Sequence, residues 1–330
     1  MSQTKAGILA ELHALIGDDL ERTNQIILDN LKAKEELIPT LGAHLINGGG
    51  KRLRPILTLV TSKLFGYKGN QAALMAAVIE FIHTATLLHD DVVDHSDTRR
   101  GQATANSVWG LKAPVLVGDF LFSRAFQLLT AYGDLRILEI IADACAVISE
   151  GEVKQLVVSN DLNTTEDKYL EVVSGKTSTL FAAAAQIGAV LNERPKEEEK
   201  SLARYGLLLG NAYQVVDDTL DYAASTKTLG KAIGDDFQEG KITLPVIHAY
   251  HHGTEEERAF WRDCLEDGQQ TDTSFKRALE LINKRGSIHY AMDKARAFAM
   301  EAKTYLDPLP STPERDAMAK LADFSVDRSF

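Results

Sequence analysis

Apolar residues recur with the period of an α-helix along most of this chain, and no stretch of consequence alternates with the period of a β-strand. Leu9, Leu12 and Ile16 share one helical face, and the run Gln71–His89 is apolar nearly all round, which is typical of a buried central helix. The pattern therefore predicts an all-α protein. Helices are expected twice within 6–41, then at 56–65, 71–89, 113–132, 135–157, 166–191, 201–222, 246–251, 255–266, 272–285 and 287–306, and once after 312.

Acidic residues gather where the long apolar helix is expected to end. Asp90 and Asp94 are four residues apart, so they lie on one helical face with Asp91 beside them. Like charges at this spacing repel by roughly 0.2–0.5 kcal/mol per pair, so a sequence that keeps them usually supplies cations. Mg²⁺ suits such a place because it binds one or two carboxylates together with substrate phosphates. A single acidic triplet is nevertheless more often a solvated helix end.

A second triplet changes that balance. Asp217, Asp218 and Asp221 repeat the DDxxD spacing, again after an apolar segment, Tyr213–Val216. Chance duplication of the motif, each time beneath an apolar helix, is improbable. The two triplets together predict facing acidic clusters in which a few divalent cations hold a polyanion, most simply a diphosphate.

Composition limits the classes of protein and partner. The 330 residues are 45% hydrophobic, which predicts a sizeable core and allows one large helical domain over 1–330. The formal net charge is −11, which disfavours nucleic acid as a partner because nucleic-acid binding needs a basic surface. Phosphate ligands remain compatible, since metals and local basic clusters can invert the field inside a cleft.

Cysteine usage and the N-terminus predict a cytoplasmic protein. The two cysteines, Cys145 and Cys264, form neither a disulfide framework nor a zinc pattern. The first 25 residues lack the basic start and apolar core of a signal peptide. No run of 18 apolar residues occurs, so no membrane span is predicted.

Basic residues cluster at two expected loops. Lys51, Arg52 and Arg54 follow three glycines and precede Pro55, which makes either an anion site or a solvated basic turn. This is not a nucleotide P-loop, because Arg52 stands where Ser or Thr should follow the Lys. Arg99 and Arg100 follow the first acidic triplet and could make bidentate phosphate contacts.

Other polar residues interrupt apolar helices. His83 lies two turns before Asp90 on roughly the same face, where a core histidine and a ligand contact are about equally expected. The triplet 175–177 (Gly-Lys-Thr) sits inside the helix at 166–191, which indicates a kink that exposes polar groups to a cavity. Glu150 and Glu152 are either groups that support the site or ordinary helix polarity.

Taken together, these motifs resemble the long-chain trans-polyprenyl diphosphate synthases, most closely the bacterial enzymes with an octaprenyl product. The motifs occur in the family's order and spacing and cover nearly the whole chain, the last 80 residues being less distinctive. They are GGGKRLRP, FIHTATLLHDDVVDHSDTRRG, VGDF, GEVKQL, SGKTSTLF, QVVDDTLDY and LGKAIGDDFQEGKITLP.

The resemblance implies an isoprenoid-synthase helical bundle with a central active-site cavity and two or three Mg²⁺ ions. It implies that isopentenyl diphosphate is added head to tail onto an allylic diphosphate, with farnesyl diphosphate as the expected primer. Roles follow position by position. Asp90 and Asp94, with Asp91 nearby, and Asp217, Asp218 and Asp221 hold metal; Arg99, Lys176 and Lys231 contact the allylic diphosphate; Lys51, Arg54, His83 and Arg100 hold isopentenyl diphosphate; Thr177 and Gln214 lie near the reacting carbon.

Product length is expected to depend on the helix before Asp90. Ala85 and Thr86 lie about one turn deeper, where a bulky side chain would stop chain growth and a small one leaves a tunnel open. The product should therefore be much longer than C20. A large residue among Phe126, Leu129 and Tyr132 is the expected tunnel floor. The overall resemblance implies a C40 product for a quinone side chain, with C45 and C50 left open.

Partners and alternatives follow from the same motifs. The family forms homodimers, and an apolar product implies transient membrane contact during release, without an anchor. A terpene cyclase would not need a second diphosphate site, which the GGGKRLRP segment and the arginine pair provide. A non-catalytic partner subunit would be expected to lose one acidic triplet. A metal phosphohydrolase would need further His/Asp pairs besides His89–Asp90.

Overall fold

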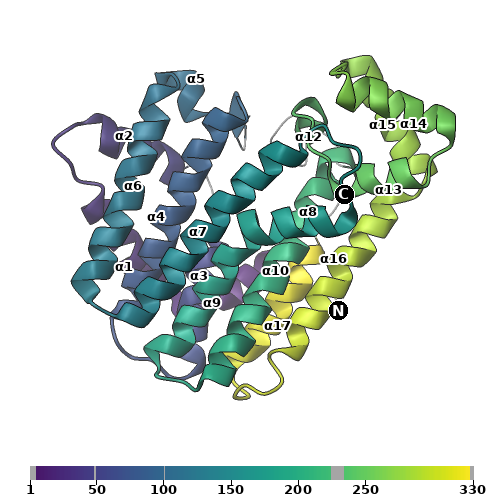
Figure 1. Ribbon diagram of the computed structural model, residues 1–330. Helices are drawn as coiled ribbons and strands as arrows, with labels where there is room; N and C mark the ends of the chain where they lie inside the picture. Colours follow the sequence, from purple (N-terminus) through teal and green to yellow (C-terminus); the bar gives the residue numbers. More distant parts are fainter. Residues whose placement is uncertain (1–4, 48–49, 100, 224–233, 328–330) are drawn as a thin grey trace. The chain divides into compact units, whose positions relative to one another are not determined.

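The computed structural model describes residues 5–47, 50–99, 101–223 and 234–327. Nearly all of its regular structure is helical (Figure 1), which confirms the all-α prediction. The helices are α1 Lys5–Asn30, α2 Leu37–Asn47, α3 Leu53–Leu64, α4 Gln71–Val93, α5 Ala105–Trp109, α6 Lys112–Tyr132, α7 Leu135–Val158, α8 Glu166–Val173, η1 Ser174–Ser178, α9 Thr179–Leu191, α10 Lys196–Ala223, α12 Asp235–Gln238, α13 Leu244–His251, α14 Glu255–Trp261, η2 Arg262–Glu266, α15 Asp272–Lys284, α16 Ser287–Thr304 and α17 Pro313–Val326.

The structure contains two short helices and a two-stranded ribbon that the sequence pattern did not predict. Helices α5 and α12 have five and four residues, too few for an apolar period to show. Strands β1 (Thr98–Arg99) and β2 (Gln102–Ala103) form a two-stranded antiparallel ribbon in which Thr98 pairs with Ala103. This ribbon lies in the segment that the sequence analysis treats as a loop.

Contacts divide the chain into two compact units. Unit 1 contains the described residues up to Cys145, Leu180–Gly206 and Tyr305–Leu321; unit 2 contains Ala146–Thr179, Leu207–Thr304 and the described residues from Ala322 onward. The chain passes between the units within α7, α10 and α17, at the start of α9 and at the end of α16. A single domain over 1–330 stays a prediction.

Helix α4 is the centre of unit 1 and packs against α1, α3 and α6. Its side chains are buried on several faces, as at Ile79, Phe81 and Ile82, in agreement with its nearly continuous apolar sequence. Within the described ranges it is also the one helix long and apolar enough to cross a membrane, by length and composition alone. Its burial is that of a core helix, so this finding carries no further weight.

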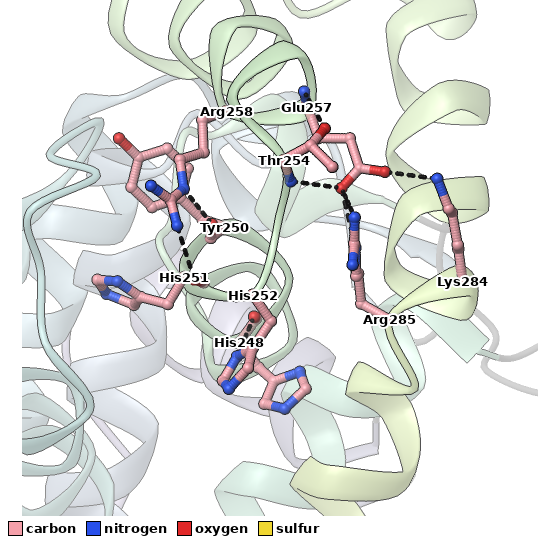
Figure 2. Close-up of polar contacts among 9 residues, drawn as sticks. All are labelled: His248, Tyr250, His251, His252, Thr254, Glu257, Arg258, Lys284 and Arg285. Carbon is pink, nitrogen blue, oxygen red and sulfur yellow. Dashed lines mark hydrogen bonds and ion pairs between the residues drawn. The ribbon is translucent and has the colours of Figure 1, made fainter.

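In unit 2, a nearly buried carboxylate links α14 to α15. Figure 2 shows Glu257, whose side chain is 5% exposed, between Lys284 (2.7 Å) and Arg285 (Nε at 2.8 Å). The same carboxylate accepts the backbone N–H of Thr254 at 3.0 Å and closes a capping box at the start of α14. The neighbouring Arg258 donates to the carbonyl oxygens of Tyr250 and His251, at the end of α13. Glu257 therefore joins α14 to the end of α15, and Arg258 joins α14 to the end of α13.

Glu257→Gln is expected to lower the midpoint of thermal unfolding at neutral pH, because it leaves two cations facing a neutral amide. The contact with Lys284, followed by those with Thr254 and Arg285, lowers the pKa of Glu257 from 4.5 to about 2. A lowered native pKa stabilises the fold above the unfolded-state pKa, and this contribution is lost as pH falls from about 4.5 through about 2. The wild-type advantage, measured by thermal unfolding, should therefore shrink over that window. Glu256→Gln, on the same helix and exposed, is the matched control, and equal melting of both variants would contradict the assignment.

Candidate active site

The first acidic triplet lies at the C-terminal end of α4 in unit 1. Asp90 is in the last turn, and Asp94 caps the helix by donating its backbone N–H to the Asp90 carbonyl oxygen at 2.8 Å. The chain then turns sharply, because His95 has a φ of 51°. A helix C-terminus carries partial negative charge, so acids there are unfavourable until a cation binds. The acidic side chains at this helix end therefore repel one another and the helix dipole unless a cation binds.

The middle acid of this triplet points into the protein. Asp91 is buried, and its Oδ1 accepts a hydrogen bond from Arg99 Nε at 2.7 Å and forms an ion pair with Arg99 Nη2, also at 2.7 Å. Burial raises the pKa of Asp91, with Arg99 acting in the opposite direction. Arg99 was predicted to contact a diphosphate, and its side chain is 34% exposed. Asp91 therefore fixes Arg99 beside Asp90 and Asp94.

Two of the predicted isopentenyl diphosphate residues meet within unit 1. Arg54 Nη1 lies 3.1 Å from His83 Nε2, and the Arg54 guanidinium lies over the Phe181 ring at 4.3 Å. Because a guanidinium can only donate, His83 Nε2 is the acceptor. Arg52, from the same basic segment, instead pairs with Glu80 at 2.9 Å, both side chains being largely buried. The basic segment thus divides between a structural pair and a candidate anion site.

The second triplet occupies the last turns of α10 in unit 2. Asp218 accepts the Tyr169 hydroxyl at 2.6 Å and the Gln214 amide at 2.7 Å. Burial, and then the charges of Asp236 and Asp217, raise the pKa of Asp218 to about 7. Asp221 is also buried, and its Oδ2 accepts the backbone N–H of Asp236 at 3.0 Å. Several carboxylates therefore share a space that disfavours their charge.

A π-helix carries the cationic and hydroxyl groups of unit 2. Within η1, Thr177 donates to Gln214 Oε1 at 2.9 Å, and Lys176 pairs with Glu152 of α7 at 2.8 Å. Gly151 and Gly175 allow α7 and η1 to cross closely. A Cβ on Gly151 would lie 2.7 Å from the backbone nitrogen of Lys176. The expected kink is thus a widened helical turn of the kind often found at functional sites.

These groups line one cavity of about 110 Å³ in unit 2. The predicted residues Lys176, Thr177, Gln214 and Asp218 all reach it. Its lining residues are Gln155, Val158, Ser159, Tyr169, Val172, Val173, Lys176, Thr177, Gln214, Asp218, Asp236, Lys241, Ile242 and Thr243.

The donor set suits a hard divalent cation that completes its shell elsewhere. Within the described ranges, no three His, Cys, Asp or Glu side chains converge as a ready-made metal site. Mg²⁺ does not need such a cage, because it keeps waters and binds substrate phosphates beside one or two carboxylates. Asp91 Oδ2 is buried without a hydrogen-bond partner among the described residues. The raised pKa of Asp218 likewise marks a place where positive charge would be favourable.

The remaining predicted residues that the structure describes do not line this cavity. Lys51 is exposed, Ala85 is fully buried, and Thr86 donates to the His83 carbonyl oxygen at 2.8 Å. Arg100 and Lys231 lie outside the described residues.

Several residues that line the cavity were not predicted as site residues, among them Tyr169, Asp236 and Lys241, and the role of Glu152 was left open. Tyr169 lies seven residues, about two helical turns, before Lys176, and this spacing was a usable signal. Asp236 and Lys241 lie in the motif LGKAIGDDFQEGKITLP, but neither was assigned a role of its own. Glu152, undecided between a supporting role and helix polarity, is the partner of Lys176, whereas Glu150 is exposed.

Known proteins are similar in sequence to nearly the whole of this chain. A family model described as polyprenyl synthetase matches residues 35–282. Octaprenyl diphosphate synthase of Escherichia coli is 46% identical over 320 residues, which cover 97% of this chain and 99% of that protein. All-trans-nonaprenyl-diphosphate synthase (geranyl-diphosphate specific) of Rhodobacter capsulatus is 38% identical, covering 96% and 97%.

A solved structure gives the same picture. The crystal structure of polyprenyl synthase from Caulobacter crescentus, complexed with calcium and isoprenyl diphosphate, is 45% identical, with a TM-score of 0.94 and coverage of 97% and 98%. A decaprenyl diphosphate synthase from Rhodobacter capsulatus has a TM-score of 0.93 at 45% identity, covering 97% and 99%.

Proposed function

Because this chain belongs to the polyprenyl synthetase family, we propose that it is a long-chain trans-polyprenyl diphosphate synthase. It adds isopentenyl diphosphate units head to tail onto an allylic diphosphate. The observation that supports this most directly is that Lys176, Thr177, Gln214 and Asp218 line the same cavity. A cation, two neutral dipoles and a carboxylate suit the departure of a diphosphate and the allylic cation that remains.

The acidic triplets would hold two or three Mg²⁺ ions together with the allylic diphosphate. Asp90 and Asp94 serve in the first triplet, and Asp217, Asp218 and Asp221 in the second. When bound, Mg²⁺ neutralises negative charge on the leaving diphosphate. The donor atoms are hard carboxylate oxygens, and calcium in the Caulobacter relative is a hard cation of the same class.

Side chains of this protein bind and orient the two diphosphates. Lys176, Arg99 and Lys231 contact the allylic diphosphate, with Glu152 and Asp91 holding Lys176 and Arg99 in place. Isopentenyl diphosphate is bound by the remaining cationic set, Lys51, Arg54, His83 and Arg100. Two diphosphate sites distinguish a synthase from a cyclase, which ionises a single substrate.

The carbon–carbon bond forms without a side-chain nucleophile. The C–O bond of the allylic diphosphate breaks, and the diphosphate leaves with the electron pair. The isopentenyl double bond then attacks the allylic cation, and the proton lost in the last step goes to the released diphosphate. Thr177 and Gln214 place weak dipoles near the cation, and the apolar walls exclude water.

The product is proposed to be octaprenyl (C40) diphosphate, for a quinone side chain, made from farnesyl diphosphate. Relatives with octaprenyl, nonaprenyl and decaprenyl names are all 38–46% identical to this chain, so identity alone leaves C45 and C50 open. We further propose a cytoplasmic homodimer that touches the membrane only while it releases this apolar product.

The test is an assay with farnesyl diphosphate, radiolabelled isopentenyl diphosphate and Mg²⁺, followed by chromatographic sizing of the extracted lipid. We expect a C40 product that disappears with EDTA and returns when Mg²⁺ is restored. Another dominant long product would keep the reaction and overturn the length. Diphosphate release from farnesyl diphosphate alone, without a longer lipid, would instead indicate a cyclase or a hydrolase.

A further inference from the structure

Tyr169 of α8 makes a short hydrogen bond to the second acidic triplet. Its side chain is 5% exposed, and its hydroxyl lies 2.6 Å from Asp218 Oδ2. A carboxylate accepts and a phenol donates, so the direction of this bond is fixed. The bond occupies Oδ2 and leaves Oδ1 toward Gln214, whose Nε2 lies 2.7 Å away. Tyr169 therefore helps to fix the orientation of the Asp218 carboxylate that accepts from Gln214.

The direction of the two remaining hydrogen bonds follows from the Asp218 carboxylate, which can only accept. The Gln214 amide donates its N–H to Asp218, so its carbonyl oxygen faces the other way and accepts the Thr177 hydroxyl at 2.9 Å. With its proton committed to Gln214, the Thr177 oxygen presents lone pairs to its surroundings. All four side chains line the same cavity. An oxygen in this state suits a developing cation, whereas a hydroxyl proton would oppose it.

The helix that carries Tyr169 is also held one turn away, at Glu166. Glu166, at the start of α8, accepts the Tyr290 hydroxyl and pairs with Lys294, both at 2.5 Å. Both partners belong to α16, in the C-terminal part of the chain to which the sequence analysis assigned no chemistry. Glu166 and Tyr169 are three residues apart, so α8 is fixed one turn from the hydroxyl.

We propose that Tyr169 is a positioning residue for the condensation step, acting through Asp218 and Gln214 to orient the Thr177 hydroxyl. The inference rests on the proposed function. Tyr169 itself does not touch the reacting carbons. The Asp218 carboxylate, which can only accept, sets the polarity of the chain of hydrogen bonds Asp218–Gln214–Thr177. The Tyr169 hydroxyl holds that carboxylate in its orientation, and α16 keeps α8 in place through Glu166.

The test compares Tyr169→Phe with Tyr205→Phe. Each removes one hydroxyl from a buried tyrosine, and the Tyr205 hydroxyl donates to the Met318 carbonyl oxygen at 2.7 Å, within unit 1. We expect Tyr169→Phe to lower the single-turnover rate of the first condensation about 10- to 100-fold, the range for groups that orient metal-binding carboxylates. KM for farnesyl diphosphate should stay within about twofold, because no substrate contact is lost. Tyr205→Phe should leave the rate unchanged.

A double-mutant cycle with Thr177→Val separates orientation from a structural role. If Tyr169 acts through Thr177, the double variant should be little slower than Thr177→Val alone, whereas independent effects would multiply. Thr177→Ser, which keeps the hydroxyl, should recover most of the rate. A multiplicative cycle, or a Tyr169→Phe rate within twofold of wild type, would overturn the proposal.

Two further measurements keep the outcome decisive. Thermal unfolding reports whether Tyr169→Phe folds. If it does not, the Tyr290→Phe, Lys294→Met double variant releases α8 instead, and an unchanged condensation rate in that variant would overturn the inference. If the wild-type enzyme makes no longer lipid from farnesyl and isopentenyl diphosphates, the proposed function fails, and this inference fails with it. An active wild type with an unaffected Tyr169→Phe variant would refute the positioning role alone.

Discussion

Asp90→Asn is expected to lower kcat about 10²–10³-fold, the usual loss when one preorganised electrostatic group is removed from a reaction centre. Asp90 is partly exposed in the last turn of α4, so the fold should tolerate the change. The midpoint of thermal unfolding should move by no more than about 2 °C. Rates are measured at saturating Mg²⁺ with both diphosphates, and Mg²⁺ titration should show weakened activation.

Asp91→Asn is the matched comparison, one residue away. Asp91 is buried and holds Arg99 through a hydrogen bond and an ion pair, both at 2.7 Å, so the neutral amide should cost about 1–3 kcal/mol of folding free energy. Both the thermal midpoint and the rate should fall, because Arg99 loses its orientation. If Asp90→Asn destabilised the fold and Asp91→Asn did not, the division of roles within the triplet would be wrong.

Ala85→Phe is expected to shorten the product to a few isoprene units while the first condensation continues. Ala85 precedes Asp90 by five residues, about 7.5 Å along the helix, so a ring there would block a growing chain early. Product length is read by chromatography, and the rate of the first condensation is measured separately. Unchanged length at normal activity would remove Ala85 from the path of the product.

Two further variants control this experiment. Ala85 is fully buried, so a phenyl ring can also overpack the core at a cost of about 1–3 kcal/mol, which thermal unfolding will reveal. Ala85→Met, smaller and more flexible, should give products of intermediate length. Thr86→Phe tests the neighbouring position, whose side chain is only partly buried. The variant with the larger shortening identifies the residue on the product side.

Long elements and local spacing were predictable from the sequence, because periodicity is a property of neighbouring residues. Helix α4 was expected to begin at Gln71 and does so, and the interruption at 174–177 is the π-helix η1. The family resemblance implied only that Thr177 and Gln214 both lie near the reacting carbon, and their hydrogen bond was not predicted. By contrast, α5, α12 and the β1–β2 ribbon are too short to produce a readable period.

The supporting residues could not be predicted from spacing alone. Tyr169 reaches Asp218 across 49 positions, and Lys176 reaches Glu152 of another helix. The residues around a tyrosine in the sequence do not predict that its hydroxyl will contact a carboxylate. This contact depends on how α8 lies against α10. The same holds for Asp91, whose two neighbours in the triplet look identical in sequence yet differ in burial.

The π-helix also uncouples the two halves of a long helical segment. A π-turn contains one residue more than an α-turn, so residues before and after η1 lie on faces offset by about 100° from those of an uninterrupted helix. Tyr169 of α8 can thus be aimed at Asp218 while the apolar face of α9 follows the different requirements of its own core. Deleting one residue from Ser174–Ser178 would restore a regular helix and force one of these two faces out of register. The extra residue acts as an insertion in a continuous helical segment. It allows the site residues of α8 and the core residues of α9 to be oriented independently.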